Sequence, residues 1–216
     1  MFTNLFYRVQ SKVRSLLRLG QAVIRGGSSK PLYPNSQSDG LKVHLGAGPI
    51  NLQGWVNVDA RADSHIHLQA EGFDLDEFTD GAISEIYMCH VLEHFSVAES
   101  ELVLGKLHRK LKTGGVLRLS VPDFDKLVDV YLANSRRLGS VSQALLGGQD
   151  YEYNFHKSLY TPSFLKDLLG SCGFADPVEW TAKEDFGVDL EDWSEKKYIT
   201  PKSVSHISLN LKARKA

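Results

Sequence analysis

The spacing within HLGAGPINLQGWVNVDA, residues 44–60, constrains the fold of this chain more than any other stretch. An apolar strand expected at 42–46 leads into a glycine turn, and a second strand expected at 56–59 ends in an aspartate. Only nine residues, 47–55, separate the two strands, whereas a parallel crossover usually takes a dozen or more. A β-hairpin closed by GPINLQG fits this length, and a shortened parallel crossing is the alternative.

The same stretch has the residue types of a nucleoside site. Gly46 and Gly48 let the backbone turn tightly and approach a ligand without a Cβ in the way. Asp59, at the end of the next strand, is placed to accept hydrogen bonds from a ribose diol. The dinucleotide fingerprint fails, because Asn51 stands where a third glycine is wanted and Asp59 comes thirteen residues after Gly46 instead of about twenty. Nicotinamide and flavin cofactors are therefore disfavoured.

From Leu41 onward, short apolar runs alternate with segments of helical periodicity, which predicts an α/β domain. The expected strands are 42–46, 56–59, 65–68, 83–89, 116–121, 177–182 and 204–212. Further helices are expected at about 124–138 and from Thr161-Pro162 to Gly173.

The helix after the fourth strand has the clearest boundaries. Ser96 and Glu99 have the spacing of a capping box, and the helix is expected to end before Gly114-Gly115. The residues expected to face inward are Leu102, Leu107 and Leu111.

Residues 1–39 differ from the body of the chain. They carry six basic residues against one acid, and apolar residues recur at helical spacing between the basic ones, followed by a linker rich in Gly, Ser and Pro. We expect a basic amphipathic helix with its linker at 1–39 and the main domain at 40–216. The helix fits contact with an anionic membrane surface or a protein partner; packing on its own domain and organelle targeting are the alternatives.

Composition limits the function classes. The body from Gly40 carries nineteen basic and twenty-five acidic residues, which argues against nucleic-acid binding. Cys89 and Cys172 show no ligand spacing, which favours a reducing compartment. No apolar run is long enough to span a membrane and the N-terminus lacks the apolar centre of a signal peptide, so we expect a cytoplasmic protein, peripheral to the inner membrane surface if the helix binds there.

Two polar clusters fall where strands are expected to end. CHVLEHF places His90, Glu93 and His94 within one turn; such residues can bind metal, but the continuous helix of a metalloprotease motif is missing, so we expect them to shape a pocket without a metal. After the fifth strand, Asp123 is expected to cap the next helix, with a catalytic role as the alternative. His156, followed by Lys157 and Tyr160, is the preferred general base over Asp123.

Five motifs in order resemble those of class I S-adenosylmethionine-dependent methyltransferases: HLGAG, GWVNVDA, ISEIYMCHVLEHF, LKTGGVLRLSVPDFDKL and HKSLYTPSFLKDLLGSCGF. The resemblance covers roughly residues 41–212 and is greatest to a compact bacterial group often associated with surface-polysaccharide biosynthesis, which has the same abbreviated link between its first two strands. It implies a Rossmann-like α/β fold, with a mostly parallel seven-stranded sheet and an antiparallel last strand.

The resemblance also implies the site. Backbone at Gly46, Ala47 and Gly48 would approach the methionine part of S-adenosyl-L-methionine, and Asp59 would bind its ribose. Gln69 stands where the family commonly has an aspartate for the adenine amino group. His90 and Leu92 complete the expected cofactor-binding set.

The implied reaction is methyl transfer by in-line displacement to a small polar acceptor, with a saccharide or glycan precursor as the expected class. Alternatives are a catalytically inactive relative that acts as a binding or scaffolding module, and a nucleotide-sugar or NAD-linked enzyme, which the missing third glycine argues against.

Overall fold

The computed structural model describes residues 33–34, 40–70, 75–199 and 204–216, all within one compact unit that spans Tyr33–Ala216. The expected N-terminal helix and nearly all of its linker lie outside the described residues. None of the helices in the described ranges combines the length and apolar character needed to cross a membrane.

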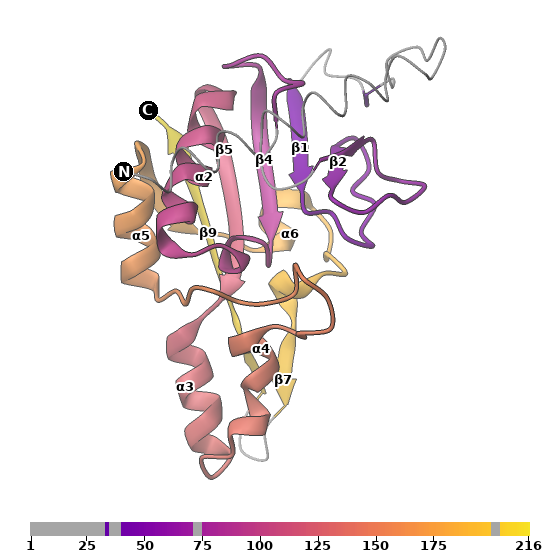
Figure 1. Ribbon diagram of the computed structural model, residues 1–216. Coiled ribbons are helices and arrows are strands. Elements are labelled where there is room, and N and C mark those ends of the chain that lie inside the picture. The colour runs from indigo at the N-terminus through magenta and orange to yellow at the C-terminus, as the bar shows by residue number, and fades with distance from the viewer. Residues whose placement is uncertain (1–32, 35–39, 71–74, 200–203) are drawn as a thin grey trace, which may run out of the picture. The chain divides into compact units, whose positions relative to one another are not determined.

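A seven-stranded sheet organises the described domain, in the order β3-β2-β1-β4-β5-β9-β6 (Figure 1). Its members are β1 (Leu41–Leu45), β2 (Val56–Asp59), β3 (Leu68–Gln69), β4 (Ile83–Cys89), β5 (Leu111–Pro122), β6 (Phe174–Glu179) and β9 (Ser208–Lys215). The pairs among β1 to β5 are parallel, and β9 runs antiparallel to both β5 and β6. The expected mostly parallel sheet with an antiparallel last strand is confirmed.

The abbreviated parallel crossing after the first strand is confirmed, and the alternative of a hairpin is wrong, because β1 and β2 pair in parallel with Val43 opposite Val56. None of the residues 46–55, all of which the structure describes, is helical. Short turns make the crossing instead, with hydrogen bonds from Ile50 N to Ala47 O at 3.0 Å and from Trp55 N to Leu52 O at 3.2 Å. The crossing is short because it has no helix.

The two faces of the sheet are covered differently. The helices α2 (Val97–Lys110) and α5 (Pro162–Ser171) pack on one face (Figure 1), where their leucines join the main apolar core. Side chains alternate along a strand, so Tyr87 of β4 faces the other side from its neighbours Ile86 and Met88. There Tyr87 packs with Trp55, Trp180 and Leu190, which come from the crossing and from around α6 (Ala182–Phe186).

Several boundaries differ from the sequence expectations. The capping box of Ser96 and Glu99 is confirmed, but α2 ends at Lys110, so Gly114 and Gly115 lie inside β5. Leu102 is 74% exposed, because five residues of helix turn it about 140° away from Leu107. The inward residues of α2 include Val103, Leu104 and Leu107.

The strand expected at 65–68 is reduced to β3, and the one expected at 177–182 begins earlier, directly after Gly173 ends the preceding helical segment with a φ of +89°. The helix expected at 124–138 is shorter: α3 (Phe124–Ala133) is followed by a 3-10 turn (Leu138–Ser140) and α4 (Ser142–Leu146).

The last expected strand, 204–212, is divided at Ile207. Its first part is β8 (Val204–His206), which pairs with β7 (Lys197–Ile199) in a separate sheet. The division follows from Ile207, whose side chain is buried among residues of α3 and α4 and whose carbonyl accepts a hydrogen bond from Asp123 N at 2.8 Å.

His44 of β1 is a buried polar residue under the aromatic face. Its ring stacks on Tyr87 with centroids 5.1 Å apart, and Nδ1 lies 3.2 Å from Asn57 Oδ1. Burial lowers the pKa of His44 to about 4, against the opposing effects of the Asn57 hydrogen bond and of nearby carboxylates. The folded protein therefore holds this histidine neutral.

We expect this histidine to make stability depend on pH. The pKa of His44 is lower in the folded protein than its ordinary 6.5, so protonation favours the unfolded chain. The free energy of unfolding is therefore highest above pH 6.5 and decreases as the pH falls towards 4. The decrease in the free energy of unfolding is on the order of 3 kcal/mol. Urea unfolding of wild type and His44→Gln over this range measures it; equal pH dependence in both proteins would contradict the assignment.

Candidate functional site

The glycine turn after β1 and the end of β2 meet at the carboxyl edge of the sheet. Gly46 and Gly48 have φ of +72° and +53°. The amides of Gly46 and Ala47 donate to Val58 O at 2.8 and 3.0 Å, and Gly48 N donates to Asp59 Oδ2 at 2.8 Å. The structure thus brings together Gly46, Ala47, Gly48 and Asp59.

Gly46 also lies at a close approach between two loops. A Cβ added to Gly46 would overlap the Val91 side chain, which follows the neighbouring strand β4. The same addition at Gly48 would meet only the end of the Arg61 side chain, at 3.8 Å. Gly46 is therefore required for packing as well as for its left-handed φ, whereas the space beside Gly48 is nearly open.

Gln69 lies beside Asp59 at this edge, since the two residues are partners in the parallel β2–β3 pair. Its Nε2 donates to Ala60 O at 2.9 Å. Sequence reasoning missed His65, whose Nε2 lies 2.9 Å from Gly48 O. No residue pattern indicated this contact, because it depends on the path of the loop between β2 and β3.

The side chains of His90 and Leu92, the other two expected cofactor residues, make contacts within the protein. His90 has a φ of +52°, and its Nε2 lies 2.8 Å from the hydroxyl of Ser208, at the start of β9. Its ring packs against Trp193. The Leu92 side chain is 1% exposed and belongs to the main apolar core, so a cofactor at the edge could meet only its backbone.

Asp123 caps α3, as expected. Oδ1 accepts from Asp125 N at 3.1 Å and from Lys126 N at 3.4 Å, while Oδ2 lies 3.3 Å from Lys126 Nζ. Tyr160, named beside His156 in the sequence, is buried, and its hydroxyl bonds Ser100 Oγ at 2.8 Å. Both residues are occupied by structural contacts.

His156 lies against Glu93, which sequence reasoning did not foresee. Glu93 belongs to a short 3-10 helix (Leu92–His94) after β4, and its carbonyl accepts from Lys157 N at 2.8 Å. This bond places His156 Nε2 3.9 Å from Glu93 Oε1, while His90 Nδ1 lies 3.1 Å from the same oxygen. The ring of His94 packs edge-on against that of His156.

Charges around Glu93 decide its protonation. Burial would raise the pKa of the Glu93 carboxyl, but His90, His156 and His94 outweigh burial and hold the pKa below its ordinary value. Burial lowers the pKa of His156, against the attraction of Glu93. At neutral pH the cluster therefore contains an ionised carboxylate beside a neutral His156.

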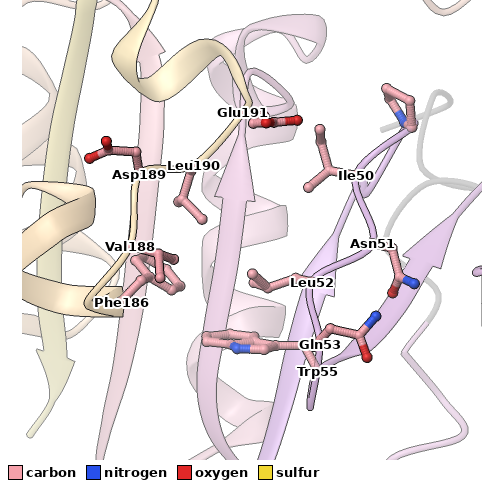
Figure 2. Close-up of a pocket in the computed structure, with 11 residues that line it drawn as sticks. Ile50, Asn51, Leu52, Gln53, Trp55, Phe186, Val188, Asp189, Leu190 and Glu191 are labelled. Carbon is pink, nitrogen blue, oxygen red and sulfur yellow. The ribbon is translucent and has the colours of Figure 1, made fainter.

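A cavity of about 440 Å³ adjoins the glycine turn (Figure 2). It lies between the β1–β2 crossing and the segment after α6, with Ile50 and Glu191 towards one end and Trp55 and Phe186 towards the other. Its size is within the usual range for small-molecule sites. The missing crossover helix leaves this space, and no motif in the sequence indicated it.

Similar solved structures identify the fold. One, from Archaeoglobus fulgidus and described as a SAM dependent methyltransferase, aligns over 97% of this chain and 99% of its own, with 13% identity and a TM-score of 0.52. Another, from Thermotoga maritima and described as a SAM-dependent methyltransferase, possible histamine N-methyltransferase, aligns over 82% and 83%, with 15% identity and a TM-score of 0.51.

A third is the 1,6-didemethyltoxoflavin-N1-methyltransferase of Burkholderia thailandensis with bound 1,6-didemethyltoxoflavin and S-adenosylhomocysteine, which aligns over 82% of this chain and 71% of its own, with 16% identity and a TM-score of 0.51. No protein-family model matches the chain, and no curated protein does. At these identities the likeness shows the fold, which is the Rossmann-like fold of class I methyltransferases.

We expect Gly46→Ala to destabilise the protein more than Gly54→Ala. Both glycines have left-handed φ, +72° and +80°, but a Cβ at Gly54 meets nothing within 4 Å. Backbone strain alone costs about 1–3 kcal/mol, and the overlap with Val91 adds to it only at Gly46. Denaturant unfolding measures the difference, and adding Val91→Ala should reduce it. Equal losses in the two single variants would contradict the close approach.

Proposed function

We propose that this chain transfers a methyl group from S-adenosylmethionine to a small polar acceptor. The observation that carries the proposal is the junction at the carboxyl edge of β1 and β2, where the turn of Gly46 to Gly48 is bonded to Asp59. In open α/β sheets, ligands bind outside the carboxyl ends of the strands. The fold shared with methyltransferases supports this choice among nucleoside ligands.

The residues at this edge fit the proposed cofactor. Oδ2 of Asp59 accepts the amide of Gly48, while Oδ1 accepts the amide of Arg61 and, at 3.5 Å, Arg61 Nε. A carboxylate oxygen can accept two hydrogen bonds, so Oδ2 can still accept a ribose hydroxyl. Gln69 uses its amide nitrogen on Ala60, which leaves its carbonyl oxygen to receive the adenine amino group. Bound cofactor supplies an activated methyl group on a sulfonium.

The protein's part in such a reaction is to align the acceptor and exclude water. For a hydroxyl acceptor we propose His156 as the base, because Nδ1 donates to Ala144 O at 3.0 Å and leaves the Nε2 lone pair free. A positioned base contributes about 10²–10⁴-fold. Asp123 is the weaker candidate, since both of its oxygens are held by the helix cap and Lys126.

We propose a saccharide or glycan precursor as the acceptor. The motif resemblance suggests this class, and the segment before His156 supports it with the exposed aromatic residues Tyr151 and Tyr153. The Arg61 guanidinium lies over the Tyr151 ring at 5.6 Å, so this segment reaches the end of β2. Aromatic side chains beside polar groups suit a sugar ring, which has apolar and hydroxyl-bearing faces.

Asp59 provides the direct test of cofactor binding. We expect Asp59→Ala to weaken binding of S-adenosylhomocysteine at least about tenfold, since a lost hydrogen bond to a charged group costs about 1.5–3 kcal/mol. Asp167→Ala removes an exposed carboxylate from α5 and should leave affinity unchanged. Isothermal titration measures both; no binding by wild type, or equal binding by both variants, would contradict the proposal.

We further propose that residues 1–39 form a separate basic segment whose first 25 residues bind anionic membrane surfaces. The sequence supports this through alternating basic and apolar residues at helical spacing. Deleting residues 1–25 should abolish co-sedimentation with phosphatidylserine-containing vesicles, and added salt should weaken binding of the full chain. Unchanged co-sedimentation after the deletion would exclude this role.

A further inference from the structure

Glu93 is a buried charge without a hydrogen-bond donor of its own. Its side chain is fully buried, and neither carboxylate oxygen has a hydrogen-bond partner among the described residues. The nearest basic side chain is that of His90, whose Nδ1 lies 3.1 Å from Oε1. Buried carboxylates are normally hydrogen-bonded, paired or bound to metal. Oε2 of Glu93 has no hydrogen-bond donor among the described residues and is free to bind a ligand.

Two histidines lie beside this carboxylate: His156 Nε2 is 3.9 Å from Oε1, and one ring nitrogen of His94 lies within 4.8 Å of a ligand atom of Glu93 and of His156. His156 Nδ1 lies 3.0 Å from Ala144 O and His94 Nδ1 lies 3.3 Å from Phe155 O. A carbonyl oxygen only accepts, so in both rings Nδ1 carries the proton and, in the neutral ring, Nε2 carries a lone pair. Histidines that bind metal are commonly oriented in this way, by a hydrogen bond from the other ring nitrogen to a backbone carbonyl.

We propose that Glu93, His94 and His156 bind one divalent first-row transition-metal ion. One ligand atom from each residue lies within 4.8 Å of the others. Ligands at about 2.1 Å from a tetrahedral zinc ion lie about 3.4 Å apart, close to the 3.9 Å between Glu93 Oε1 and His156 Nε2. Two imidazoles and a carboxylate suit zinc and its neighbours in the first transition row.

The backbone holds this site together before any ion arrives. Glu93 O accepts from Lys157 N at 2.8 Å and from Ser158 N at 3.3 Å, which fixes the segment of His156 against the 3-10 helix that carries Glu93 and His94. His90 acts as a positioning residue, because its ring joins Glu93 to the hydroxyl of Ser208. This proposal departs from the sequence expectation that the cluster shapes a pocket without a metal.

The metal site goes beyond the proposed methyl transfer and stands without it. Three protein ligands leave a coordination position open, as in catalytic zinc sites. A hydroxyl or water bound there would have a lowered pKa. With the ion present, His156 would be a ligand, and the ion would take over its role in activating an acceptor hydroxyl.

Zinc titration of the metal-free, untagged full chain tests the site without cofactor or acceptor, so its failure would leave the methyl-transfer proposal untouched. We expect one zinc ion per chain, and at least about tenfold weaker binding in Glu93→Gln and in His156→Ala. His108→Ala is the matched control, because His108 lies near the end of α2 against Phe174. It should bind zinc as wild type does.

Two further readouts separate metal binding from misfolding. Zinc should raise the Tm of wild type and of His108→Ala, but not of His94→Ala or Glu93→Gln. Cobalt(II) should give a visible ligand-field spectrum with wild type that His156→Ala alters. The proposal is overturned if wild type binds no stoichiometric zinc, or if the ligand variants match wild type in affinity, Tm shift and cobalt spectrum.

Discussion

The fold depends on the parallel pairing of β1 and β2 across ten residues that contain no helix. Val58 O accepts hydrogen bonds from both Gly46 N and Ala47 N, so the chain turns at once where β1 ends. This turn places the amide of Gly48 on the carboxylate of Asp59. The proposed nucleoside site is therefore a direct consequence of how the short crossing is made.

The short crossing also determines how the second face of the sheet is covered. Without a crossover helix, Trp55 from the crossing packs with Tyr87 and with the segment around α6. Arg118 of β5 pairs there with Glu85 of β4 and Asp185 of α6, which fastens α6 to the sheet. The cavity of Figure 2 lies between these two covering segments. The cavity and the tight glycine turn both follow from a crossing that has no helix.

Sequence patterns predicted the structural features that form between residues close together in the chain. Two helix caps could be predicted, the capping box of Ser96 and Glu99 and the cap at Asp123, because each is completed within three residues. Ordered motifs predicted the sheet. The sequence did not reveal the cluster of Glu93 with His156, because a backbone bond between segments more than sixty residues apart creates it. It also did not reveal the break at Ile207, which packing under α3 imposes.

We propose that a nucleoside cofactor binds where the turn after β1 meets Asp59. Amide chemical shifts of isotope-labelled protein during titration with S-adenosylhomocysteine test it most directly. We expect saturable shifts that are largest at the amides of Gly46, Ala47, Gly48 and Asp59, with smaller changes near Gln69. No saturable shifts, or shifts confined to the opposite edge of the sheet near Gly114 and Gly115, would contradict it.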